Sequence, residues 1–180
     1  MDSFKADVVI HGVFVNVGGT GVLVVGDPGI GKSECALELV ARGHRLIADD
    51  VVEISGSDDV LVGAAPERFA GLLEIRGLGI IDVRRLFGND SFEERHQLDL
   101  CVELFAEAAC EIRDRLGEER PRLELLDVRI PKFDLLVDRN RNIPLLIETV
   151  AKLCKTQVGL EEGSLIASHD SLVLSAANQG

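Results

Sequence analysis

The chain has 180 residues, of which 46% are hydrophobic and 28% charged, and this balance indicates one folded domain rather than a disordered chain. No apolar run approaches the roughly 20 residues of a membrane-spanning helix, and the N-terminus lacks a signal peptide, so we expect a cytoplasmic protein without a membrane partner. The net charge of −12 and the absence of Trp and Tyr argue against a nucleic-acid partner.

The N-terminal part of the chain alternates between apolar segments and glycine-rich turns. Residues 7–25 are predicted to form a β-hairpin, because alternating valines flank the turn at residues 18–21. A glycine-rich segment follows the second strand, and residues 34–42 then carry apolar side chains at helical spacing. A short strand over residues 45–48 is predicted to end at two aspartates, and another strand is predicted over residues 51–54.

The rest of the chain is patterned less strongly. We expect a polar connection over residues 84–94, a strand over 98–104, a helix over 106–116, one or two strands over 128–137 and a helix from Ile143 to about Lys155 that Asn142 caps. The predicted fold is a single α/β domain over residues 1–156, with a mixed sheet flanked by helices. Residues 157–180 stay unassigned.

Residues 26–33 match the phosphate-binding motif GxxxxGK[ST] between a predicted strand and a predicted helix. Glycines let successive N–H groups point into one anion-sized hollow, toward which the helix directs its positive end. Lys32 would contact the terminal phosphates of a nucleotide and the Ser33 hydroxyl would reach Mg²⁺, whereas an ordinary glycine-rich turn is the alternative. The predicted cofactors are ATP and Mg²⁺, and the predicted nucleotide-binding residues are Gly26, Asp27, Pro28, Gly29, Ile30, Gly31, Lys32 and Ser33.

Asp49 and Asp50 follow the next apolar strand, where a P-loop protein needs a carboxylate to hold or orient Mg²⁺. Adjacent residues of a strand face opposite ways, so the two carboxylates should have different roles. One would lie in the metal shell, and the other would accept a proton from a hydroxyl nucleophile. The alternative is a turn at a strand end with two solvated acids.

His11 lies in the first strand of the predicted hairpin. If the hairpin turns symmetrically about Thr20, His11 lies opposite Pro28 in the phosphate-binding loop, allowing for a slip of one or two residues. This proximity favours a role at the phosphates, although a lone strand histidine is more often a structural residue.

These segments together resemble the HPr kinase/phosphorylase family. The resemblance rests on residues 11–13, 26–34 and 42–50, and above all on the string Leu73-Glu74-Ile75-Arg76-Gly77-Leu78-Gly79-Ile80-Ile81-Asp82, which is close to a family signature. It is strong over residues 8–87 and thinner to about residue 156. It implies phosphorylation of a serine of HPr, the small phosphocarrier of the sugar phosphotransferase system, and removal of that phosphate by phosphorolysis. It also implies a P-loop fold related to phosphoenolpyruvate carboxykinase and a hexamer.

The resemblance further implies roles for single residues. Asp50 would be the general base toward the serine hydroxyl and the acid in the reverse reaction. Lys32 and His11 would be the catalytic pair that contacts phosphate. Ser33 and Glu74 would contact Mg²⁺, with Asp49 beside them as the carboxylate expected near the metal.

Three features depart from the family pattern. The chain starts ten residues before His11, where larger members carry another domain, so it is either a short form or an excised kinase half. Gln97 stands where we align a catalytic arginine of the family, which makes Arg95 the nearest substitute. The family's dephosphorylation loop, V-R-P-G-R-N, corresponds to residues 137–142 without its proline and glycine, so we expect kinase activity more firmly than phosphorylase activity.

The leading hypothesis is therefore an ATP- and Mg²⁺-dependent serine kinase that acts on HPr and regulates carbon metabolism. One alternative is a kinase for another protein or for a small hydroxyl metabolite. Another is a nucleotide-binding regulatory module with little turnover.

Overall fold

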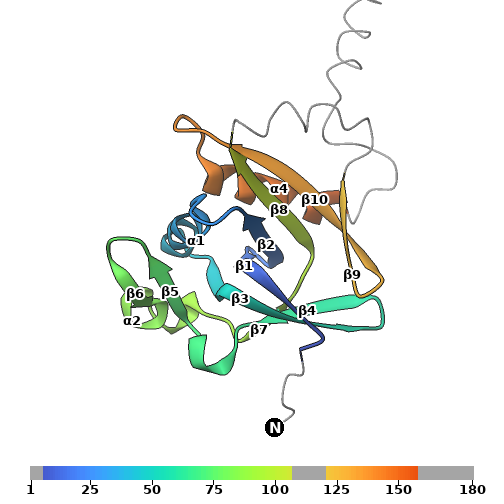
Figure 1. Ribbon diagram of the computed structural model, residues 1–180, viewed down its shortest axis with the longest axis horizontal. Helices are drawn as coiled ribbons and strands as arrows, with labels where there is room; N and C mark the ends of the chain where they lie inside the picture. Colours follow the sequence, from blue (N-terminus) through green and yellow to red (C-terminus); the bar gives the residue numbers. More distant parts are fainter. Residues whose placement is uncertain (1–5, 107–120, 158–180) are drawn as a thin grey trace, which may run out of the picture.

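The computed structural model describes residues 6–106 and 121–157. Its main element is an eight-stranded mixed sheet in the order β7-β4-β3-β1-β2-β8-β10-β9, and a separate hairpin pairs β5 with β6 (Figure 1). β8 lies parallel to both β2 and β10, whereas the other pairs are antiparallel. The mixed sheet confirms the predicted α/β class. The strands are β1 (Val8–Val17), β2 (Thr20–Gly26), β3 (Arg45–Ser57), β4 (Val60–Ala64), β5 (Leu72–Ile75), β6 (Gly79–Asp82), β7 (Arg95–Gln97), β8 (Leu100–Ala106), β9 (Arg122–Leu125) and β10 (Val128–Val137).

Two helices, α1 (Lys32–Ala41) and α4 (Ile143–Gln157), cover one face of this sheet. Leu39 of α1 and Ile147 of α4 are fully buried in one cluster with valines of β1, β2 and β8. Asn142 accepts a hydrogen bond from the Leu145 N–H at 3.0 Å, which confirms the predicted cap of α4. The helix predicted over residues 106–116 lies, apart from residue 106, outside the described residues. Residues 158–180 lie outside them as well. No helix of the described part is long and apolar enough to cross a membrane.

The sheet curls over a second core on its other face. Phe14 and Leu23 of the central strands are fully buried there, together with Leu61 of β4 and Ile130 of β10. The end of β3 approaches the turn between β9 and β10, because a methyl group on Gly56 would lie 3.0 Å from Leu126 (Figure 1). The candidate site lies where β1, the end of β2 and the middle of β3 come close to the start of α1.

Substitution of Gly63 by alanine is expected to lower the free energy of unfolding by about 1–3 kcal/mol through overpacking of this second core. A methyl group at Gly63 would lie 2.6 Å from a ring carbon of Phe14, which is fully buried and has no room to retreat. Urea unfolding measures the loss. The double variant Phe14→Leu, Gly63→Ala should lose less stability than the two single losses added together, and strictly additive losses would contradict a direct clash.

The predicted N-terminal hairpin is confirmed, and its register differs by two residues from a symmetric turn about Thr20, a slip that the prediction allowed. The turn consists of Gly18 and Gly19, both with positive φ (61° and 90°), and Val17 pairs with Thr20. A two-residue turn with both residues left-handed matches the twist of the paired strands better than a turn centred on Thr20. Consequently His11 does not pair with Pro28. It pairs with Val51 of β3, on the other side of β1.

The structure corrects two further predictions, one for a strand and one for a connection. The strands expected separately over residues 45–48 and 51–54 form one strand, β3, which continues to Ser57. β1 pairs with residues 45–54 of it and β4 with residues 53–57. The polar connection expected over residues 84–94 contains the helix α2 (Val83–Phe87) and a 3₁₀ turn, Asn89–Ser91. Another 3₁₀ turn, Glu67–Phe69, precedes β5. The Asp82 carboxylate accepts a hydrogen bond from the Arg84 N–H at 3.0 Å and so caps the start of α2. The polar composition of this segment alone indicated a connection rather than a capped helix.

Candidate active site

A glycine-rich loop joins β2 to α1 and forms the floor of the candidate site. Gly26, Gly29 and Gly31 have φ values of 142°, 79° and 105°, which L side chains rarely adopt. At Gly26 a methyl group would also lie 2.4 Å from the Leu104 carbonyl oxygen of β8. The loop therefore takes this shape because glycine stands at these positions, and it leads directly into the first turn of α1 at Lys32.

Lys32 is the cation of this loop. Its side chain is buried, and its Nζ donates hydrogen bonds to the carbonyl oxygens of Gly26 at 2.8 Å and Asp27 at 3.1 Å. An ammonium group has three donors, so one remains for an anion held above the loop. The loop carbonyls thus fix the position of the charge before any ligand binds.

Asp49 is the buried acid of the site. Its carboxylate accepts hydrogen bonds from the Ser33 hydroxyl and from the Glu74 N–H, both at 2.9 Å. Burial raises the pKa of Asp49 above its ordinary value, against the opposing effect of these two hydrogen bonds. Asp49 therefore ties together the first turn of α1, the middle of β3 and the β5–β6 hairpin.

Asp50 is the exposed acid, and it forms an ion pair with His11 of β1 with 2.9 Å between carboxylate oxygen and Nδ1. Regular strand geometry predicts that Asp49 and Asp50 point to opposite faces. The backbone of Asp50 departs from that geometry with a φ of 66°, and both side chains line the same cavity. Backbone strain of this kind concentrates at functional sites. The two carboxylates differ in burial, since Asp49 is buried and Asp50 is exposed.

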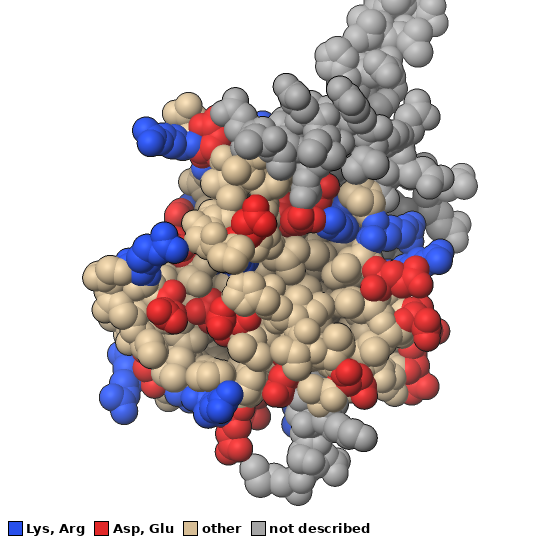
Figure 2. Space-filling view, in the orientation of Figure 1, with Lys and Arg blue, Asp and Glu red and all other residues tan. Residues whose placement is uncertain are grey.

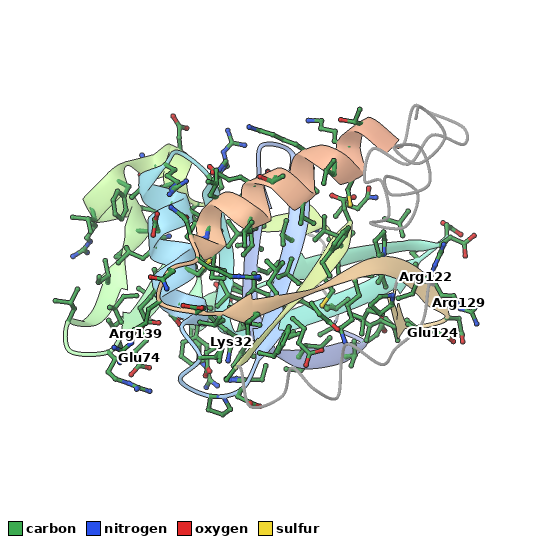
Figure 3. The ribbon with its side chains drawn as sticks, turned by 90° about the horizontal axis from the view of Figure 1, so that it is seen from above. Lys32, Glu74, Arg122, Glu124, Arg129 and Arg139 are labelled. Atoms are coloured by element: carbon green, nitrogen blue, oxygen red, sulfur yellow. The ribbon has the colours of Figure 1, made fainter. Side chains whose placement is uncertain are left out.

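These side chains converge on a cavity of about 270 Å³ at the end of the sheet where Lys32 and Glu74 lie (Figure 3). The cavity brings together residues from four separate segments of the chain, and most of the predicted site residues are among them. Its lining consists of His11, Val13, Pro28, Gly29, Gly31, Lys32, Ser33, Glu34, Asp49, Asp50, Glu74 and Arg76. Gly26, Asp27 and Ile30 complete the loop beneath it without lining it.

The arginine of the cavity is Arg76, not the predicted Arg95. Arg95 lies on β7, where it pairs with Ala64 at the edge of the sheet, and it is not among the lining residues. Arg76 follows β5, and its guanidinium lies against the phosphate loop, because a methyl group on Gly29 would be 3.0 Å from it. Sequence reasoning missed Arg76 as a site residue, although it stands two positions after Glu74 in the string that carries the family resemblance.

The donor set fits a magnesium ion that shares its ligands with phosphate. No group of three or more His, Cys, Asp or Glu residues in the described part of the chain is placed to hold a metal alone. Mg²⁺ in phosphate-binding sites uses one or two carboxylates, a hydroxyl and phosphate oxygens. Ser33, Asp49 and Glu74 supply oxygen atoms of these kinds at the cavity.

Replacement of Asp49 by asparagine is expected to raise the unfolding temperature at pH 7 by about 2–4 °C, which corresponds to about 1 kcal/mol for a domain of this size. The amide oxygen can accept the Glu74 N–H and the amide nitrogen can donate to Ser33, so both hydrogen bonds persist without a buried charge.

The gain should shrink as the pH falls through the raised pKa of Asp49. Below that pKa the native carboxyl is neutral and its burial no longer costs stability. Calorimetric scans at several pH values measure this. A lower unfolding temperature for the variant at pH 7 would contradict the assigned cost of burying the charge.

The fold and this site together define an α/β protein with a glycine-rich loop shaped to hold an anion beside two carboxylates. The particular family follows from comparison with known proteins. The family model of the HPr Serine kinase C-terminal domain matches residues 2–165, and the chain belongs to this family.

Relatives with this assignment come from distant bacteria. The HPr kinase/phosphorylase of Geobacillus kaustophilus is 48% identical over 143 residues, covering 79% of this chain and 46% of the relative. That of Treponema pallidum is 44% identical over 150 residues, covering 82% and 47%. The chain thus spans about half the length of the curated relatives it matches. The solved structure of the Hpr(Ser) kinase/phosphatase from Coxiella burnetii superposes with a TM-score of 0.77 at 33% identity, covering 84% of this chain and 93% of that one.

Proposed function

We propose that the chain is the catalytic domain of an ATP- and Mg²⁺-dependent kinase that phosphorylates a serine of HPr. The observation that carries this proposal is the Asp50–His11 pair, which faces the glycine-rich loop across a single cavity. Relatives named HPr kinase/phosphorylase support the choice of reaction and acceptor. The P-loop fold type related to phosphoenolpyruvate carboxykinase, a homohexamer and a cytoplasmic location belong to the same proposal.

Phosphoryl transfer needs alignment, charge neutralisation and one proton acceptor rather than covalent help from the protein. The serine oxygen of the acceptor forms a bond to the γ-phosphorus, and the bond between that phosphorus and the bridging oxygen breaks toward ADP. The serine proton passes to the Asp50 carboxylate. His11, 2.9 Å from Asp50, holds this carboxylate toward the cavity.

Two cations of the chain act on the phosphates. Lys32 reaches them from the loop, where Gly26 and Asp27 hold its ammonium group. Arg76 follows β5, and its guanidinium lies against the same loop at Gly29. Such fixed charges stabilise the negative charge that develops on the transferring and leaving oxygens. Ser33, Asp49 and Glu74 would hold Mg²⁺, which would supply further neutralisation of the phosphate charge.

The same parts would serve phosphorolysis, in which inorganic phosphate attacks the phosphorus of phosphoserine, the bond to the serine oxygen breaks and pyrophosphate forms. Asp50 would then return the proton to the serine oxygen. The loop over residues 137–142 bears on this activity. Asp138 closes the loop here, since its carboxylate accepts the Asn140 N–H at 2.9 Å and its carbonyl accepts the Arg141 N–H at 3.1 Å. A side-chain turn thus replaces the proline and glycine of the family pattern, and kinase activity remains the firmer part of the proposal.

A transfer assay with γ-labelled ATP, Mg²⁺ and purified HPr tests the proposal, with HPr that lacks the target serine as the control. Label on HPr but not on the control supports a serine kinase. Label on a different protein or on a small molecule, with none on HPr, would reject HPr as the acceptor. Binding of ATP without any transfer would reject the kinase assignment in favour of a regulatory nucleotide-binding module.

A further inference from the structure

A second cavity, of about 480 Å³, lies beside the phosphate loop on the outer flank of α1. It shares only Gly31 and Glu34 with the first cavity, so the two adjoin at the first turn of α1. Its apolar floor includes Ile30, Leu104 and Val137. The loop between β10 and α4 forms its far wall.

The first cavity is small for a whole nucleotide. Cavities that enclose small-molecule ligands measure roughly 300–1,000 Å³, and the first measures about 270 Å³. A nucleoside triphosphate whose phosphates occupy the first cavity would therefore extend beyond it. The second cavity offers that room in direct continuation.

The side chains of the second cavity favour a nucleoside over further phosphates. Glu34 and Glu38 stand one helical turn apart on α1 and both line the cavity, and Glu38 also pairs with Arg42. Carboxylates repel phosphate groups but accept hydrogen bonds from ribose hydroxyls. Arg139 and Arg141 on the facing loop present planar guanidinium groups, which stack on the faces of aromatic bases.

The loop that carries these arginines is held in place at both ends. Asp138 closes its turn, and Asn142 caps α4 immediately after it. Figure 3 shows Arg139 at the same end of the molecule as Lys32 and Glu74, whereas Arg122, Glu124 and Arg129 lie at the other end. The arginines are therefore presented by a loop of defined shape rather than by an unconstrained segment.

We propose that the second cavity binds the ribose and base of the nucleotide, with Arg139 stacked on the base and Glu34 and Glu38 toward the ribose hydroxyls. This inference rests on the proposed function. It also fixes the direction of the nucleotide. The γ-phosphate lies toward Asp50 and His11, which line only the first cavity, and the nucleoside leaves past Glu34.

Calorimetry with ATP and with inorganic tripolyphosphate, both with Mg²⁺, tests the inference, because tripolyphosphate has the phosphates but no nucleoside. In Arg139→Ala the dissociation constant of ATP should rise about tenfold, which is the scale of one stacking contact, and that of tripolyphosphate should change less than about twofold. Arg139→Lys keeps the charge but loses the planar group, so it should weaken ATP selectively as well. Arg129→Ala, which removes the same charge at the far end of the molecule, is the matched control and should alter neither ligand.

Equal weakening of ATP and tripolyphosphate by Arg139→Ala would overturn the inference, because Arg139 would then act on phosphate charge alone. Unchanged binding of both ligands would overturn it too. Either result leaves the proposed kinase function intact as long as the unmodified chain binds ATP. If the unmodified chain bound neither ligand, the proposed function and this inference would fall together.

Discussion

Asp50→Asn is expected to lower phosphoryl transfer to the acceptor serine by about 10²-fold or more, because it removes the group that accepts the serine proton. Nucleotide affinity should change little, since Asp50 is exposed and faces the acceptor side of the cavity. Asparagine tolerates the left-handed backbone found at this position, so the fold should persist. Initial transfer rates and calorimetric ATP affinity, measured on the same preparation, separate the two effects.

The matched control is Asp59→Asn. Asp59 is an exposed aspartate with a φ of 63°, close to the 66° of Asp50, but it lies in the turn between β3 and β4 away from the cavity. This variant should transfer phosphate at the unmodified rate. Equal activity of Asp50→Asn and the unmodified chain would remove Asp50 from the role of proton acceptor.

Lys32→Ala is expected to reduce both steps, with nucleotide affinity lower by about 10–100-fold and transfer lower by about 10²–10³-fold. In the proposed function, the ammonium group contacts phosphate in the ground state and stabilises the charge that grows during transfer. Its loss also leaves the carbonyl oxygens of Gly26 and Asp27 without their donor, which loosens the loop. Binding calorimetry and single-turnover rates measure the two losses separately.

Lys155→Ala provides the control for Lys32→Ala. Lys155 also donates from Nζ to a turn carbonyl, that of Gly18 at 3.0 Å, but it does so on the surface near the end of α4. Its removal should leave affinity and rate unchanged. Unaltered ATP affinity in Lys32→Ala would argue that the loop does not bind phosphate through this lysine.

The surface charge does not attract an anionic ligand at long range. Acidic side chains are spread over the described surface in Figure 2, and no continuous basic band crosses the described atoms of that face. The cations of the site, Lys32 and Arg76, therefore act within a chain of net charge −12. Affinity for phosphate must come from the loop itself rather than from long-range attraction, so we expect it to depend only weakly on ionic strength.

Local elements of the fold were predictable, whereas pairing between strands was predicted less well. The hairpin of β1 and β2, the helix after the phosphate loop and the cap at Asn142 depend on neighbouring residues, whose side-chain pattern is visible in the chain. The register of the hairpin differs by two residues from a symmetric turn about Thr20 because the turn conformation of Gly18 and Gly19 decides it. The length of β3 was missed because it depends on pairing with β1, not on its own composition.

The amino-acid sequence by itself determined the glycine-rich loop between β2 and α1. Its glycines, lysine and serine are contiguous, and only glycine readily adopts the backbone angles that the loop requires. Tertiary structure alone decided which distant side chains face that loop. An irregularity in the pairing of β1 with β3, between Phe14 and Val15, and the left-handed backbone of Asp50 accompany the approach of His11 to Asp50. Contacts of this kind depend on strand register and sheet curvature, and neither is encoded in any short segment of the chain.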